Sequence, residues 1–406
     1  MKFVFTVLML FLSIWGRSQY NFDILQGKQA IQIPFELDNN FIVIRITVNK
    51  TLPLRFIFDT GAEHTILTKG ELSASLGLRY EREFQLIGAD LQTQLTAYLS
   101  RRNHLQVGDA IFPSMDLLVL KEDYLHIEEY TGTAIHGILG ADFFKRFVVK
   151  IDYRRKEITL ESHNSFVVPS KYREIPVEIH RHKPYIRSHI QLQTGSAEIP
   201  VKLLIDTGAS LSLLIHNETS PALKLPEQVI SGKVGMGLGG VIEGFIGRLQ
   251  ECCIGKNCFD NIITNFQTLD SVRDTSFLNG RNGLIGSTLL QRFTIYIDYV
   301  AGRLYVRPHR RYKRAFRFDR SGLGVIASGE NLSQFVVQQV LEGSPADEAG
   351  VQIGDEILKI NGVPSALLTL QGIAFRFQRR GSKKIKLLVR RNGRREKLDF
   401  QLRDLI

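Results

Sequence analysis

Two short segments of this sequence end an apolar run with the same four residues, Asp-Thr-Gly-Ala, at positions 59–62 and 206–209. Two carboxylates in contact cannot both ionise cheaply, so a pair formed by these acids would share one proton. The ionised member could then act as a general base on water, while the protonated member polarises a carbonyl group and later donates its proton. The alternative for either segment alone is a turn that ends a strand, which Asp and Gly favour.

The two segments belong to an internal repeat. GILGADFFKRFVVKIDY at 137–153 matches GLIGSTLLQRFTIYIDY at 283–299, and in each half the glycine that ends the Ile-Leu-Gly or Leu-Ile-Gly triplet, Gly140 or Gly286, follows its Asp-Thr-Gly at a nearly equal distance. A repeat of this length indicates two related lobes. It also makes chance a poor explanation for the pair of Asp-Thr-Gly segments.

Between these motifs the chain is mostly of strand type. Runs such as IVIRITV at 42–48 are rich in β-branched or aromatic residues and are separated by turn residues. We expect short helices in ADFFKRF at 141–147 and STLLQRF at 287–293. Residues 162–183 join the two lobes, and the basic segment 307–318 closes the second. The pattern predicts a mainly β, two-lobed fold.

This arrangement resembles the aspartic protease superfamily over about residues 30–308. The Asp-Thr-Gly-Ala form is closer to retropepsin-like members, whereas two lobes in one chain are the pepsin-like arrangement. The resemblance implies a cleft between the lobes, with Asp59 and Asp206 as catalytic residues at its floor and with no covalent intermediate, cofactor or metal. It assigns structural roles only to Gly140 and Gly286. The residues that it implies as support for the dyad are Thr60, Gly61, Thr207 and Gly208, the threonines through hydroxyl groups that bond to the opposite loop and the glycines through close backbone approach.

A cleft enzyme of this kind needs a lid over its substrate. The glycine-bearing candidates are LIGADLQTQLTAY at 86–98, with Tyr98 as a candidate lid tyrosine, and VGMGLGGVIEGF at 234–245. Each of them is alternatively an ordinary hairpin. Glu63 and His64 follow the first Asp-Thr-Gly-Ala and break the repeat. They could shift the proton affinity of the nearby carboxylate or simply face solvent. A lone His is more often a surface or satisfied residue than a catalytic one, so we leave His64 outside the site and assign Glu63 no role in it.

From Phe318 onward the sequence changes character. The run GSPADEAGVQIGDEILKING at 343–362 resembles a PDZ domain, a small β-sandwich or barrel with two helices. The family's carboxylate-binding loop would correspond to Gly322, Leu323, Gly324 and Val325, whose backbone N–H groups could capture the terminal carboxylate of a peptide. The next strand edge could then pair with that peptide. The alternative is a PDZ fold that only caps or orients the protease.

The N-terminus combines Lys2, an apolar stretch and small residues near Ser18, as in a secretory signal peptide. An uncleaved anchor is the alternative. We therefore expect an extracytoplasmic protein, whether periplasmic, secreted or surface-associated. In ECCIGKNC, a two-residue turn at Gly255-Lys256 would place Cys253 opposite Cys258, where a disulfide and free thiols are equally allowed. A zinc site is not expected, because no fourth ligand follows at a finger-like spacing.

The formal net charge of +11 is concentrated after Arg307 and carries no information on the chemistry upstream. Aromatic residues do not alternate with the basic ones, so nucleic-acid binding is not expected. We expect a peptide or protein substrate, a C-terminal peptide ligand at the PDZ domain and, as a minority interpretation, weak contact with an anionic membrane surface. A catalytically silent peptide-binding protein is the second hypothesis. The predicted boundaries are 1–18 for the signal peptide, 22–161 and 172–308 for the lobes, and 317–404 for the PDZ domain.

Overall fold

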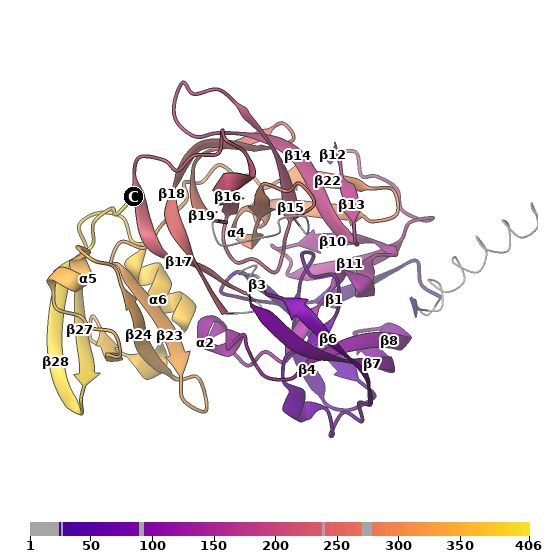
Figure 1. The fold of residues 1–406 in the computed structure, drawn as a ribbon, viewed down its shortest axis with the longest axis horizontal. Coiled ribbons are helices and arrows are strands. Elements are labelled where there is room, and N and C mark those ends of the chain that lie inside the picture. Colours follow the sequence, from indigo (N-terminus) through magenta and orange to yellow (C-terminus); the bar gives the residue numbers. More distant parts are fainter. Residues whose placement is uncertain (1–23, 26, 89–92, 238–239, 270–277) are drawn as a thin grey trace, which may run out of the picture.

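The computed structural model describes residues 24–25, 27–88, 93–237, 240–269 and 278–406. The predicted signal peptide lies outside these residues. Within them, no helix is both long enough and apolar enough to cross a membrane. The fold is mainly β, with two lobes and a separate C-terminal domain, as the sequence predicted (Figure 1).

The first lobe is built on a sheet that brings two distant segments of the repeat side by side. Its strand order is β2-β3-β4-β9-β5-β8-β7-β6, in which β4 and β9 run parallel. The short β5 lies between β9 and β8, so the chain after β4 adds its next strands to the same sheet. The strands are β2 (Glu36–Asp38), β3 (Phe41–Val48), β4 (Pro53–Phe58), β5 (Ile66–Leu67), β6 (Tyr80–Ile87), β7 (Gln94–Val107), β8 (Ala110–Leu120) and β9 (Gly137–Leu139).

The second lobe repeats this topology strand for strand. Its order is β13-β14-β15-β20-β16-β19-β18-β17, with β15 parallel to β20. The sequence repeat therefore corresponds to a structural duplication. The strands are β13 (Glu178–His180), β14 (Lys183–Gln191), β15 (Ile199–Ile205), β16 (Leu213–His216), β17 (Val229–Gly237), β18 (Gly240–Ile254), β19 (Asn257–Gln267) and β20 (Gly283–Ile285).

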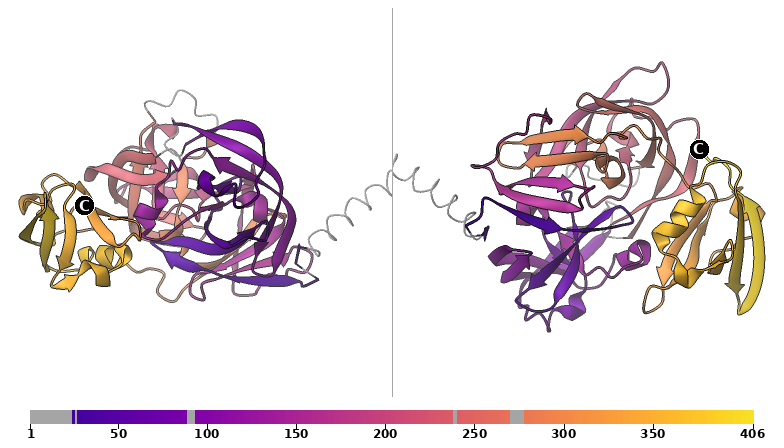
Figure 2. Two further views of the ribbon diagram at one scale, coloured as in Figure 1. Left: turned by 90° about the horizontal axis from the view of Figure 1, so that it is seen from below. Right: turned by 180° about the vertical axis from the view of Figure 1, so that it is seen from behind.

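A third sheet joins the lobes, because β10 of the first pairs with β21 of the second in antiparallel register, with Lys150 opposite Tyr296. Figure 2 shows this sheet from behind, between the two lobes. Side chains from both lobes meet in one hydrophobic core against it. Its strands, in spatial order, are β1 (Ala30–Pro34), β11 (Glu157–Ser162), β10 (Phe147–Asp152), β21 (Phe293–Asp298), β22 (Arg303–Pro308) and β12 (Arg173–Pro176).

Short helices punctuate the lobes. The two helices predicted after the repeated glycines are present as α3 (Ala141–Phe144) and α4 (Ser287–Leu290), and each directs apolar side chains into the core, three from α3 and two from α4. A further helix, α2 (Ile127–Thr131), lies in the first lobe and has no counterpart in the sequence prediction. The 3₁₀ turns of the lobes are η1 (Gly70–Leu72) and η2 (Asn217–Thr219).

The C-terminal domain has its own hydrophobic core and the two helices that the sequence predicted. Ser344 caps α5 through a side-chain hydrogen bond, and proline stands in the first turn of that helix, where a missing N–H costs nothing. The elements are β23 (Leu323–Ser328), β24 (Gln334–Val340), α5 (Pro345–Glu348), β25 (Glu356–Ile360), β26 (Val363–Pro364), η4 (Ser365–Leu367), α6 (Leu370–Phe377), β27 (Lys384–Arg391) and β28 (Arg394–Gln401).

The sheet between the lobes should dominate the stability of the two-lobed unit. Ile151 lies in β10 with no exposed surface, so Ile151→Ala should lower the free energy of unfolding by about 2–5 kcal/mol. Leu52→Ala removes a side chain that is 79% exposed and should change it by less than about 0.5 kcal/mol. Urea denaturation of both variants checks this, and equal midpoints would contradict it.

Candidate active site

The two Asp-Thr-Gly loops lie against each other between the lobes. Asp59 follows β4 and Asp206 follows β15, so each acid ends a strand that runs parallel to the strand before the repeated glycine. The Asp59 N–H donates to the carbonyl oxygen of Leu139, and the Asp206 N–H donates to that of Ile285, both at 3.0 Å. The same local structure therefore positions both acids.

The threonine side chains of the two loops cross from one lobe to the other and are fully buried. The Thr60 N–H donates to Thr207 Oγ1, and the Thr207 N–H donates to Thr60 Oγ1, each at 3.0 Å. Each hydroxyl also donates at 2.7 Å, from Thr60 to the carbonyl oxygen of Ile205 and from Thr207 to that of Phe58. Each of these N–H and hydroxyl groups finds its hydrogen-bond partner in the opposite lobe. The crossed threonines therefore fix the two loops relative to each other.

The glycines bring backbone N–H groups against the carboxyl groups. Gly61 donates to Asp59 Oδ1 at 2.7 Å, and Gly208 donates to Asp206 Oδ1 at 2.8 Å. A Cβ added to Gly61 would lie 2.6 Å from Asp206 Cγ, and one added to Gly208 would overlap the carboxyl group of Asp59. Each acid thus touches the glycine of the opposite loop. Only a residue without a side chain leaves room for that contact.

Burial raises the pKa of both acids. The pKa of Asp59 lies well above its ordinary value, first because burial penalises the carboxylate and then because Asp206 presents a like charge and a hydrogen bond. Burial also raises the pKa of Asp206, against the opposing effects of the hydrogen bond with Asp59 and of the Arg281 guanidinium. The two acids therefore titrate as one unit that retains a proton.

Two tyrosines near the dyad were not singled out by the sequence analysis. Tyr153 and Tyr299 are buried, and the pKa of each is raised by burial first and then by the charge of one acid of the pair, Asp206 for Tyr153 and Asp59 for Tyr299. Both end the repeated Ile-Asp-Tyr of the matched segments. The repeat itself was therefore the signal that could have identified them.

Arg281 breaks the symmetry of the site. It lies two residues before β20, whereas Ile135 holds the equivalent place before β9. Burial lowers the pKa of Arg281, and its buried Nε has no hydrogen-bond partner among the described residues. Its charge acts on Asp206 from the second lobe alone. No local pattern marks this residue, because its role depends on a difference between the repeats.

The two lid candidates are equivalent edge hairpins, formed by β6 and β7 in the first lobe and by β17 and β18 in the second. Residues 89–92 and 238–239, at their ends, lie outside the described residues. Tyr98 pairs with Glu83 within the first hairpin, and its ring stacks on Tyr80 with centroids 4.7 Å apart. This places Tyr98 along the hairpin, several residues from its end.

Glu63 and His64, which the sequence analysis left outside the site, lie at the edge of the first loop. Half of the His64 side chain is exposed, and its nitrogens are 3.7 Å from a Glu63 oxygen and 3.9 Å from an Asp142 oxygen. Glu63 also pairs with Arg181 of the second lobe at 3.1 Å. Both side chains are thus engaged in surface ion pairs.

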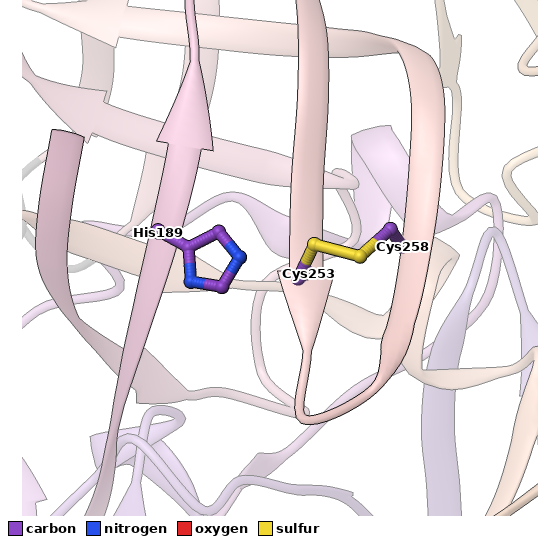
Figure 3. A group of neighbouring side chains, drawn as sticks. All are labelled: His189, Cys253 and Cys258. Carbon is purple, nitrogen blue, oxygen red and sulfur yellow. A yellow bond between two sulfur atoms is a disulfide. The ribbon is translucent and has the colours of Figure 1, made fainter. Parts of the chain in front are cut away.

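The cysteine run forms the hairpin that its sequence allowed. Cys253 and Cys258 are opposite each other on β18 and β19 and form a disulfide, while Cys252 is a buried free thiol. The His189 ring lies beside this disulfide (Figure 3), and the three side chains could each offer a ligand atom to a metal ion. Both sulfur atoms are consumed by the disulfide, so the oxidised hairpin does not have the thiolates that a metal would need.

The predicted carboxylate-binding loop of the PDZ domain opens β23, and a half-buried acid, Asp319, precedes it. Asp319 Oδ1 accepts hydrogen bonds from the N–H groups of Ser321 at 2.8 Å and Gly322 at 2.7 Å. The Leu323 N–H donates to the Ser321 hydroxyl at 3.1 Å. The first N–H groups of the loop thus already have partners within this chain.

The threonine crossing makes a specific prediction. Thr60→Val keeps the shape of the side chain but leaves the Thr207 N–H and the Ile205 carbonyl oxygen without a partner. We expect it to lower the free energy of unfolding by about 2–4 kcal/mol, since each buried group left unpaired costs about 1–3 kcal/mol. Thr60→Ser keeps the hydroxyl and is the matched control. Thermal unfolding of the two variants measures the difference, and a Thr60→Val variant no less stable than Thr60→Ser would contradict a role for the hydroxyl.

Asp319 should make the stability of the PDZ domain depend on pH. Burial raises its pKa from 3.8 to about 6, so the folded state holds a proton that the unfolded state releases between these values. The resulting stabilisation is complete at low pH and is lost as the pH rises through about 6. We expect Asp319→Asn, which stays neutral, to remove this part of the pH dependence in calorimetry from pH 4 to 7. The exposed change Asp399→Asn should leave it in place, and equal behaviour of the two variants would refute the assignment.

Comparison with known proteins identifies two domains. An aspartyl protease family model matches residues 44–143, and a PDZ domain model matches residues 336–391. The chain is also similar to tight junction protein ZO-3 of Canis lupus familiaris, with 32% identity over 132 residues, and to Tax1-binding protein 3 of Homo sapiens, with 40% identity over 57 residues. These matches cover 30% and 14% of this chain but only 15% and 46% of the two relatives. The chain therefore contains an aspartyl protease domain and a C-terminal PDZ domain.

Proposed function

We propose that this protein is an aspartic endopeptidase that cleaves peptide bonds with a water molecule activated between Asp59 and Asp206. The observation that supports this most strongly is the contact of two partly buried carboxyl groups, each of which lies against the glycine of the opposite loop. A lone buried acid would simply take up a proton. A pair that shares one proton offers a base and an acid at one point, as amide hydrolysis requires.

The proposed reaction uses both acids in turn. The ionised acid removes a proton from the water as its oxygen attacks the carbonyl carbon of the substrate. The protonated acid donates a hydrogen bond to the carbonyl oxygen, and a proton then passes to the leaving nitrogen as the carbon–nitrogen bond breaks. The protein forms no covalent bond to the substrate. The threonine crossing keeps the two carboxyl groups at one separation throughout.

We also propose that the PDZ domain binds a peptide of the substrate or of a partner, and that the protein acts outside the cytoplasm. The disulfide between Cys253 and Cys258 supports the second point, because disulfides persist mainly in oxidising compartments. Weak contact between the basic C-terminal part and an anionic membrane surface remains a proposal that rests on charge alone.

Cleavage of a mixed peptide library by the purified protein tests the proposed reaction. Asp59→Asn and Asp206→Asn should each reduce cleavage by at least about 10²–10⁴-fold, because each removes one of the two proton-transfer roles. Loss in only one of them would overturn the shared mechanism. No cleavage by the wild-type protein at any pH would favour the catalytically silent peptide-binding protein.

The pH profile gives an independent check. Activity requires one proton on the pair, so it should fall at high pH, when the raised pKa of Asp59 is passed, and at low pH, when the second acid is protonated. Replacing Arg281 by Gln removes a cation that favours ionised Asp206 and should move the acidic limb to higher pH. Initial rates between pH 3 and 9 measure both limbs. An acidic limb that does not move would exclude a role for the Arg281 charge.

A further inference from the structure

The peptide groove of the PDZ domain is formed by β23 and α6, which pack against each other. In the sheet, β23 pairs with β24 on one side and has no strand on its other edge among the described residues. Such an edge, beside a helix, is where an extended peptide would be added by backbone pairing. In the full chain, a segment from outside the domain lies against this edge.

Helix α2 of the first lobe packs against β23. Figure 1 shows α2 at the boundary between the protease unit and the C-terminal domain, next to β23 and α6, and the view from behind in Figure 2 shows the same neighbourhood. Because α2 packs on β23, part of the groove is covered by the protein itself.

Gly132, which ends α2, lies within the contact between α2 and the C-terminal domain. Its backbone is left-handed, with φ of 69°. A Cβ added there would lie 3.3 Å from Leu370 Cβ on α6 and 3.9 Å from Ala327 Cβ on β23. The end of α2 thus lies between the helix and the strand that bound the groove. A larger residue at this position would meet both of them.

Polar contacts hold this segment at Tyr130, through its side chain and through its backbone. Gln338 of the PDZ domain donates to the Tyr130 hydroxyl at 2.6 Å, and Asn39 of the first lobe donates to the Tyr130 carbonyl oxygen at 2.7 Å. Beside the contact, a cavity of about 430 Å³ extends between the lobe and the start of α6. Hydrogen bonds therefore fix the contact, but an open cavity lies beside it. A competing ligand would need to displace only the α2 segment.

We propose that residues 127–133 of the first lobe and a peptide with a free C-terminus compete for the PDZ groove. The proposal rests on the peptide-binding role of the PDZ domain proposed above. In the closed state seen here, the resident ligand is an internal segment without a terminal carboxylate, while Asp319 accepts the Gly322 N–H and the Ser321 hydroxyl accepts the Leu323 N–H of the loop. The domain therefore binds a segment of the first lobe that a peptide ligand can displace.

A pair of matched glycine variants tests the competition. Gly132→Glu places a side chain against Leu370 and Ala327 and should release α2 from the groove. Gly77→Glu is the control, because Gly77 has the same left-handed backbone, with φ of 65°, and nothing within 4 Å of an added Cβ. A display library of random C-terminal peptides is selected on Gly132→Glu, and the best peptide is labelled and titrated onto both variants and the wild-type protein.

We expect the peptide to bind Gly132→Glu about tenfold or more tighter than the wild-type protein and Gly77→Glu, since a groove that is mostly closed lowers the apparent affinity by its open fraction. Its C-terminal amide should bind weakly to all three. Equal affinity for the three proteins would overturn the competition while leaving peptide binding in place. Failure to select any peptide on Gly132→Glu would overturn the peptide-binding role together with the competition.

A covalent lock gives the opposite change. The 3.9 Å between the added Cβ and Ala327 Cβ suits a disulfide, so Gly132→Cys combined with Ala327→Cys should fix α2 in the groove on oxidation. Peptide binding should disappear in the oxidised double variant and return with dithiothreitol. The single variant Ala327→Cys, treated in the same way, controls for the change in the groove and for reduction of the native disulfide. Unchanged binding in the oxidised, cross-linked protein would refute the proposal.

Discussion

The crossed hydrogen bonds of Thr60 and Thr207 are the constraint on which the site depends. Bringing two carboxyl groups together costs free energy, because burial and like charge both oppose their ionisation. The approach is enforced by neutral groups that find their partners only in the opposite lobe. The sheet that continues from β10 to β21 then extends this fixed geometry over the whole interface between the lobes.

Duplication supplies this geometry, and small departures from it separate the two acids. The backbone bonds of Asp59 and Asp206 are equivalent, as are the glycines beside them. The cation at Arg281, where the first lobe has Ile135, acts only on the second acid. A symmetric pair would have no preferred site for its proton. The two acids titrate as one unit, and the Arg281 charge makes that unit asymmetric, so the two sides of the proposed dyad are not interchangeable.

The repeat explains how much of the fold and of the site could be predicted from the sequence. Each predicted element with a repeat partner, such as α3 and α4, is present, because local pattern and tertiary packing agree there. Helix α2 and Arg281 were missed, since neither has a repeated counterpart and each derives its role from a neighbour distant in the chain. The disulfide was left open because the hairpin turn fixes the separation of the two cysteines but not their oxidation state.

The position of the PDZ domain connects its groove to both lobes. In β24, Gln338 bonds to Tyr130 of the first lobe, and Gln339 lies against Gly232 of the second. Gly232 belongs to β17, in the hairpin that is the lid candidate of the second lobe. One strand of the domain therefore contacts both lobes. In the described sheet, β24 is also the only neighbour of β23. A ligand that shifts β23 would therefore shift the strand that contacts both lobes.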